Sequence, residues 1–214
     1  MAIRSVLAND SLYHIYNRGA DKREIFLDET DCLRFMRNLY DFNDVRPFEK
    51  GTDFGLKIEE KERDLLVDIL CYCLMPNHFH LILRQRQDDG ITRFMRKIGT
   101  GYGLYFNIKN ERSGVLFQGR FKGKHIENDE YFIHLSRYIH LNPVDLVKDD
   151  KVNQKEFLKS YQWSSYQTYI GMDNFPSVIN TDLLSGMFPK AFEYENFVYS
   201  LVSSRDEIGH LMLD

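Results

Sequence analysis

The amino-acid sequence predicts an α+β fold: a mostly antiparallel, ferredoxin-like sheet with helices on one face, plus a helical C-terminal extension. The first observation is the order of segments with two-residue and helical periodicity: strand, helix, strand, strand, helix, strand. The second is the short turn between the two middle strands, which permits only antiparallel pairing. The third is the polar stretch after residue 147, beyond which short helical patterns remain.

One strand, one helix and a hairpin form the first half of the predicted core. Residues 11–19 alternate between two faces and are the first strand. Asp28 starts a helix, because apolar side chains at helical spacing follow it to about Asn43. The apolar run 64–74 and the segment 78–85 are the next two strands, joined by a Met-Pro-Asn turn.

A basic helix, a strand and a third helix complete the core. The basic helix spans about 90–107, and residues 112–127 are expected to be a loop followed by a strand. Asn128 caps the third helix, which ends near Asn142 because Pro143 disfavours its continuation. The glycine-rich run within the basic helix lacks a preceding strand and a following Lys-Ser/Thr pair, so we do not expect a nucleotide-binding loop there.

The composition predicts a globular cytoplasmic protein. The chain has 214 residues, 43% hydrophobic and 28% charged, and no run approaches the ~18 apolar residues of a membrane helix. The three cysteines are expected to be reduced core residues, because they cannot all pair. We expect one domain over 1–150, with a polar insertion at about 44–63, and a helical extension over 151–214 packed on it.

Charge is distributed unevenly along the chain. The net charge is −4, yet ten lysines and arginines face only three acids between Arg84 and Lys124. That block carries +7 and leaves −11 for the rest. A basic block in an acidic protein is expected of a surface that contacts phosphates. The alternative is a solvated helix face whose charge is balanced by acids elsewhere.

Two histidines stand on one face of a predicted strand. His78 and His80 are separated by Phe79, so their rings project to the same side while Phe79 points into the core. Two such imidazoles can chelate one divalent cation. The alternative is a pair of hydrogen-bonded histidines on a sheet surface.

The third helix offers a phenol and an amide one turn apart. Tyr138 and Asn142 lie on one stripe, at the flank of the apolar stripe of that helix. A phenol there can reach a polar site at the sheet, and the amide oxygen can complete the ligand set of a metal. Alternatively, Tyr138 packs edgewise and Asn142 is simply a polar residue before Pro143.

Five segments stand out together for their order and spacing. They are LYHIYNRGADKREIF at 12–26, CLMPNHFHLIL at 73–83, YFNIKNERSGVLFQGRFKG at 105–123, SRYIHLNPV at 136–144 and YQWSSYQTYIG at 161–171. Together they resemble the single-tyrosine HUH transposases of the IS200-like group, specifically the REP-associated tyrosine transposase branch. The resemblance covers about residues 10–171, and it implies a ferredoxin-like or RRM-like sheet.

The resemblance also implies an activity and its residues. His78, His80 and Asn142 match the positions that hold a divalent metal, Mg²⁺ or Mn²⁺, and Tyr138 matches the nucleophile. The implied activity is a metal-dependent single-stranded DNA endonuclease and strand transferase, a transposase that forms a 5′-phosphotyrosine intermediate. Its substrate is expected to be hairpin-forming repeat DNA. His134, on the stripe of Tyr138, is a candidate helper in deprotonating the phenol.

Basic and polar side chains near these segments are candidate DNA contacts. They are Asn17, Arg18, Arg93, Arg96, Lys97, Gln118, Arg120, Lys122 and Lys124. The last four alternate along one extended run. We therefore expect a nucleoid-associated cytoplasmic protein whose partner is single-stranded or hairpin DNA and which needs no membrane. The sequence leaves a homodimer open.

Two other functions fit the same residues. One is a catalytically idle, sequence-specific DNA-binding regulator on the same fold. The other is a metal-dependent hydrolase in which water attacks and Tyr138 merely packs. A covalent link between protein and DNA separates both from the transposase.

Overall fold

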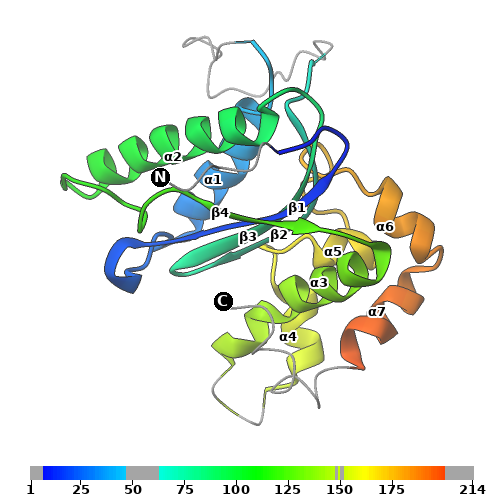
Figure 1. Ribbon diagram of the computed structural model, residues 1–214. Helices are drawn as coiled ribbons and strands as arrows, with labels where there is room; N and C mark the ends of the chain where they lie inside the picture. Colours follow the sequence, from blue (N-terminus) through cyan, green and yellow to red (C-terminus); the bar gives the residue numbers. More distant parts are fainter. Residues whose placement is uncertain (1–6, 47–62, 148, 150–151, 201–214) are drawn as a thin grey trace.

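Four antiparallel strands form one sheet at the centre of the molecule (Figure 1). The computed structural model describes residues 7–46, 63–147, 149 and 152–200, so most of the predicted insertion at 44–63 lies outside the described residues. The strands are β1 (Leu12–Arg18), β2 (Val67–Met75), β3 (His78–Gln85) and β4 (Lys122–Ile126). Their order in the sheet is β2-β3-β1-β4, and the chain order βαββαβ confirms the predicted ferredoxin-like core.

Helices cover both faces of this sheet. One face carries α1 (Glu29–Asp41) and α2 (Gly90–Lys109), which lie above the sheet in Figure 1. The opposite face is covered by α3 (Asp129–Leu141) and by C-terminal helices. The C-terminal helices are α4 (Gln154–Ser160), α5 (Tyr166–Tyr169), α6 (Asp182–Met187) and α7 (Ala191–Tyr199). Two short 3-10 helices, η1 (Ala20–Lys22) and η2 (Asn142–Leu146), follow β1 and α3.

The two-residue alternation of β3 divides the interior into two cores. Phe79, Leu81 and Leu83 are buried against α1 and α2. Ile82 belongs to the second core, which packs under α3 and the C-terminal helices. A strand buried on both faces explains why the apolar content of β2 and β3 is nearly continuous.

The predicted helix boundaries follow from caps that the structure contains. The side chain of Asp28 accepts a hydrogen bond from the Asp31 amide at the start of α1, and Asn128 caps α3 through the Tyr131 amide.

None of the helices in the described part of the chain combines the length and apolar character that crossing a bilayer requires. The three cysteines are buried thiols, as predicted.

The glycine-rich run lies inside α2, which confirms that it is not a phosphate-binding loop. Gly101 is needed there for packing. A Cβ atom at this position would lie 2.5 Å from the ring of Phe42. The absence of a side chain therefore lets α2 approach the end of α1 closely.

The segment after α4 covers the outer edge of β2. The Leu74 amide donates to the Trp163 carbonyl at 2.9 Å, and the Ser165 amide donates to the Tyr72 carbonyl at 3.0 Å. These bonds satisfy backbone groups that would otherwise be unpaired at a sheet edge. The segment therefore has a structural role at this edge.

A buried polar network ties α3 to the C-terminal helices. His140 is fully buried, with Nδ1 2.6 Å from the Tyr194 hydroxyl and Nε2 2.7 Å from the Ser165 hydroxyl. Tyr194 in turn donates to the Ser136 hydroxyl, so it accepts its bond from His140 Nδ1. Burial lowers the pKa of His140 to about 3, and the ring is neutral at pH 7.

This network makes stability depend on pH. The pKa of His140 in the folded state lies below the ordinary value of 6.5. Its stabilising contribution is therefore complete above pH 6.5 and is lost as the pH falls towards 3. We expect His140→Gln to lower the free energy of unfolding at pH 7 and to flatten its pH dependence between pH 6.5 and 4 by about 1.4 kcal/mol per pH unit. Urea unfolding of the metal-free proteins at several pH values measures this, and parallel profiles would contradict it.

Candidate functional site

The two predicted histidines meet on the α3 face of the sheet. His78 and His80 occupy alternate positions of β3, and their rings lie nearly perpendicular with centroids 5.0 Å apart. His80 is buried and His78 is half-buried. The turn before β3 holds the first ring, because Asn77 Oδ1 lies 2.6 Å from His78 Nδ1. An amide oxygen only accepts, so Nδ1 of His78 carries the proton and Nε2 keeps its lone pair.

Burial keeps both imidazoles neutral. The pKa of His78 is lowered to about 4, chiefly by burial and also by the charge of nearby Arg18, while a hydrogen bond with Asn142 opposes the shift. Burial also holds the pKa of His80 well below its ordinary value, with His14 and His78 adding to the effect. Neutral imidazole is the form that binds metal ions. The site therefore has two neutral nitrogen donors at pH 7.

Asn142 and Tyr138 come to the same place from α3. The amide nitrogen of Asn142 donates to the Tyr138 carbonyl at 2.9 Å, and the Asn142 side chain is within hydrogen-bonding reach of His78. Tyr138 is half-buried, and its ring lies edge-on to His80 with centroids 6.1 Å apart. The structure therefore brings together the four residues that the sequence singled out.

The donor set fits a divalent cation. Its members are two neutral imidazoles and one amide whose nitrogen is already committed to a backbone carbonyl, which leaves the amide oxygen as the donor. Among the described residues, no cluster of three or more His, Cys, Asp or Glu side chains is arranged to hold a metal. Two imidazoles and an amide oxygen suit Mn²⁺ and do not select strongly for Mg²⁺.

Sequence reasoning missed a third histidine at this site. His14 lies on β1, is buried, and has Nε2 2.9 Å from His80 Nδ1. Tyr16, the next residue on that face of β1, stacks on both rings. The two-residue alternation of β1 predicts that His14 and Tyr16 share a face. Only the pairing of β1 with β3 brings that face next to the two histidines.

Three basic residues extend the site across β1 and β4. Arg18 pairs in register with His78, and its charge contributes to lowering the pKa of both β3 histidines. Lys122 and Lys124 are exposed on β4, and their ammonium groups lie over the rings of Tyr16 and Tyr131. These three predicted DNA contacts therefore flank the histidines on one face.

Other predicted contacts next to β4 are placed differently. The expected alternation of Gln118, Arg120, Lys122 and Lys124 on one strand is wrong for the first two. Gly119 has a φ of +124°, which breaks the extended run, and β4 begins only at Lys122. Gln118 and Arg120 are exposed outside the strand, and Asn17 donates to the Gly119 carbonyl at 3.1 Å.

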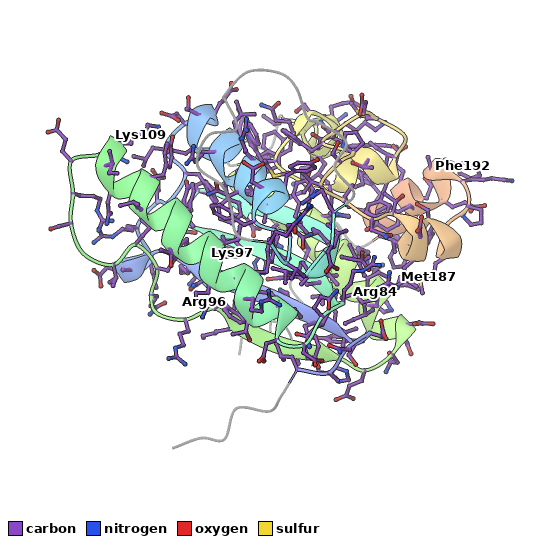
Figure 2. The ribbon with its side chains drawn as sticks, turned by 90° about the horizontal axis from the view of Figure 1, so that it is seen from above. Arg84, Arg96, Lys97, Lys109, Met187 and Phe192 are labelled. Atoms are coloured by element: carbon purple, nitrogen blue, oxygen red, sulfur yellow. The ribbon has the colours of Figure 1, made fainter. Side chains whose placement is uncertain are left out.

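The basic residues of α2 lie on the far side of the sheet from the histidines. Figure 2 shows Arg96 and Lys97 on α2, with Lys109 near its end. Lys97 donates to the Asp44 and Arg46 carbonyls, and Arg93 donates to the Val45 carbonyl. Two of the three α2 candidates thus bind the chain segment after α1, and none is brought to the histidine site.

His134, the candidate helper, does not face the histidine pair. Its Nδ1 lies 2.7 Å from an Arg137 guanidinium nitrogen, and its ring lies 6.0 Å from that of Phe197 on α7. These contacts place the side chain of His134 between its own helix, α3, and α7.

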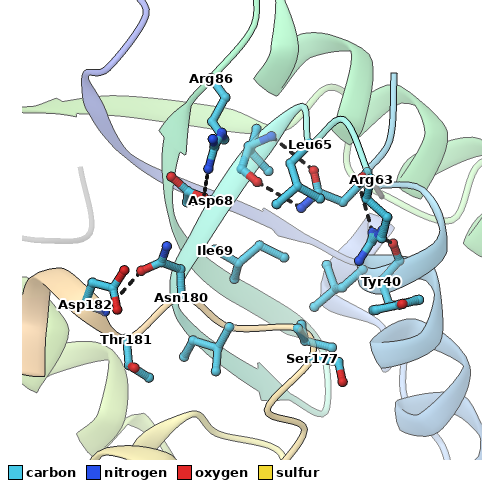
Figure 3. A pocket seen from close by; sticks show the side chains of 15 residues that line it. Tyr40, Arg63, Leu65, Asp68, Ile69, Arg86, Ser177, Asn180, Thr181 and Asp182 are labelled. Atoms are coloured by element: carbon cyan, nitrogen blue, oxygen red, sulfur yellow. Dashed lines mark hydrogen bonds and ion pairs between the residues drawn. The ribbon is translucent and has the colours of Figure 1, made fainter. Parts of the chain in front are cut away.

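A cleft of about 330 Å³ opens at the start of β2, the end of the strand that lies away from the histidines (Figure 3). Asp68 is buried there and forms ion pairs with Arg84 and Arg86, while Arg63 donates to the Tyr40 and Asn43 carbonyls. These charged groups satisfy one another or the backbone. The cleft is distant from the histidines, because β2 and β3 are antiparallel and His78 pairs with the last residue of β2.

Comparisons with known proteins agree with this geometry. Residues 49–142 match the family model described as "Transposase IS200 like", and they include both β3 histidines, Tyr138 and Asn142. This match confirms the resemblance to the IS200-like transposases that was predicted from the sequence. No curated protein matches the chain.

The fold is also similar to that of a solved structure. It is described as a REP-associated tyrosine transposase bound to a REP hairpin, and it is 16% identical with a TM-score of 0.54. The match covers 85% of this chain and 93% of that chain. At this identity the likeness establishes the fold.

Asn142→Ala tests the ligand set. We expect it to weaken Mn²⁺ binding by about tenfold or more, because loss of a ligand costs at least as much as loss of an outer-shell partner. Titration followed by the paramagnetic resonance of free Mn²⁺ measures the dissociation constant. Asn110→Ala is the matched control, since Asn110 makes the same i−4 bond, to the Phe106 carbonyl at the end of α2. Equal Mn²⁺ affinities of the two variants would contradict the assignment.

Proposed function

We propose that this protein is a metal-dependent single-stranded DNA endonuclease and strand transferase of the transposase type, with Tyr138 as nucleophile. The observation that carries the proposal is the convergence of Tyr138 and Asn142 from one helix on His78 and His80 of one strand. The family match supports the class of enzyme. Hairpin-forming repeat DNA is the proposed substrate, by analogy with the hairpin bound in the solved structure.

His78, His80 and Asn142 would hold the divalent cation, Mg²⁺ or Mn²⁺. When bound there, the cation supplies Lewis-acid stabilisation of charge on the scissile phosphate. Arg18 adds a fixed positive charge beside the same face of the sheet. Fixed positive charge close to the phosphate favours the extra negative charge that develops during phosphoryl transfer.

Tyr138 supplies the nucleophile. Its hydroxyl oxygen attacks phosphorus, the new bond is a 5′-phosphotyrosine, and the bond from phosphorus to the 3′-oxygen breaks to leave a 3′-hydroxyl. The phenolic proton must leave during attack, because a phenol of pKa ~10 is protonated at pH 7. Attack by another 3′-hydroxyl reverses the step, returns the proton to Tyr138 and joins two strands.

The lysines of β4 provide a path for the DNA strand. Lys122 and Lys124 are exposed beside the histidine face, and the rings of Tyr16 and Tyr131 lie beneath their ammonium groups. Lysines contact phosphates as point charges and without regard to sequence. We therefore assign phosphate contacts to β4 and to Arg18, ahead of the basic residues of α2.

The extension over 151–214 is proposed to support the domain over 1–150. Described residues of α4, α5, α6 and α7 share one apolar core with α3. The buried His140 network adds polar contacts between the same elements. Because α3 carries Tyr138, packing of the extension fixes the position of the nucleophile. A homodimer and association with the nucleoid remain predictions.

Tyr138→Phe tests the nucleophile. The variant should lose strand cleavage and the protein–DNA adduct entirely while keeping its fold, because only the hydroxyl of a half-buried residue is removed. Denaturing gels measure both with labelled single-stranded DNA from the flanks of the gene, chosen by a search for imperfect inverted repeats. The reactions contain Mn²⁺, Mg²⁺ or chelator.

A double variant, His78→Ala with His80→Ala, is the companion. It should also stop cleavage, and it should retain DNA binding. Cleavage by Tyr138→Phe at the wild-type rate, without an adduct, would instead establish a hydrolase that uses water. Binding by the wild-type protein without cleavage in either metal would favour the idle DNA-binding regulator.

Salt dependence tests the DNA path. Replacing Lys122 and Lys124 together by alanine should weaken single-stranded DNA binding and reduce the slope of log K against log salt by about 1.4, since each phosphate contact contributes about 0.7. Fluorescence anisotropy at several salt concentrations measures the slope. The control removes two charges from α2, Arg96→Ala with Lys97→Ala, and should leave the slope unchanged. The opposite result would place the DNA on the α2 side of the sheet.

A further inference from the structure

Both histidines of β3 have their Nδ1 atoms engaged within the protein. Asn77 Oδ1 lies 2.6 Å from Nδ1 of His78. Nε2 of His14 lies 2.9 Å from Nδ1 of His80. In each ring Nε2 is thus the nitrogen left for a ligand. The sequence explains the first contact by adjacency, whereas the second joins β1 to β3 across 66 positions of the chain.

The contact between His14 and His80 has the geometry of an in-plane hydrogen bond. The ring planes are 22° apart, and the centroids are separated by 5.1 Å. This separation is close to the nitrogen–nitrogen distance plus the distance from each nitrogen to its own centroid. The two centroids and the two nitrogens therefore lie nearly on one line. Both side chains are almost fully buried, with 2% and 3% of their surface exposed. The bond is therefore shielded from competing water.

We propose that His14 is a positioning residue that fixes the tautomer and the orientation of His80 as a metal ligand. The inference rests on the metal site of the proposed function. A ligating histidine usually donates its other ring N–H to a nearby acceptor, which fixes the ring and raises its basicity. Asn77 does this for His78, and His14 takes the corresponding place for His80.

The proton count gives the direction of the bond. For His80 to bind a cation through Nε2, its proton must be on Nδ1, and that proton is donated to Nε2 of His14. The proton of neutral His14 is then on its own Nδ1. In the opposite arrangement His14 donates, His80 carries its proton on Nε2, and the ligand atom is blocked.

The surroundings hold His14 in place and make it a partner of the ligand. Tyr16 stacks on the His14 ring at 4.8 Å and on the His80 ring at 5.8 Å. The β1–β3 ladder fixes the backbones of these residues. His14 Nε2 is already occupied by His80, and no described trio of His, Cys, Asp or Glu is arranged to hold a metal. His14 therefore acts through His80.

Two substitutions of His14 separate positioning from packing. His14→Phe keeps a ring against Tyr16 and removes the acceptor, whereas His14→Gln keeps an amide oxygen that can accept from His80. We expect the phenylalanine variant to bind Mn²⁺ about 10- to 100-fold more weakly and the glutamine variant to recover most of the loss. Isothermal titration with Mn²⁺ alone measures both. His125→Phe is the matched control, because His125 is exposed on β4 and contacts Tyr13.

Each outcome decides the proposal. Wild-type affinity in folded His14→Phe overturns the positioning role alone, as does equal weakening in the phenylalanine and glutamine variants. Failure of the wild-type protein to bind Mn²⁺ overturns the metal site and the positioning role together. A second measurement needs no variant of His14: long-range proton–nitrogen NMR of the wild-type protein loaded with Mg²⁺. We expect the His80 proton on Nδ1, and a proton on Nε2 overturns the inference.

Discussion

The rest of the site depends on the two-residue alternation of β3. Phe79 and Leu81 anchor this strand in the core under α1 and α2, so His78 and His80 must face α3. A shift of one residue in register would exchange the two sets, bury imidazoles in an apolar core and expose phenylalanine at the site. Apolar packing on one face thus fixes the position of polar chemistry on the other.

The second determinant is how α3 is held against that face. Its apolar side chains pack on the sheet, and His140 anchors it through hydroxyl groups of the C-terminal region. Tyr138 and Asn142 share a stripe beside the buried one, which directs both to the histidines. The nucleophile and the amide ligand are therefore positioned by contacts that take no part in the chemistry.

The parts of this picture that follow local rules could be predicted from the sequence. The alternation around Phe79 and the i,i+4 spacing of Tyr138 and Asn142 placed each pair on one face of its element, and the family resemblance assigned all four residues to one site. The structure brings them together. His14 could not be found in this way, because its contact with His80 depends on the register of two strands. The basic residues of α2 were nominated by charge alone, which carries no information about the face of the sheet on which a helix lies.

The chain's own segment at 163–165 covers the outer edge of β2, so the two edges of the sheet differ in whether their backbone groups are already paired. In the described part of the chain, β4 pairs only with β1, so hydrogen bonding can continue at just one side of the sheet. A sheet with one open edge can pair with the open edge of a second sheet, and the resulting pair has no open edge left. Edge-to-edge growth into fibres is therefore closed to this fold, and lysines on the remaining edge make even the single joining step less favourable.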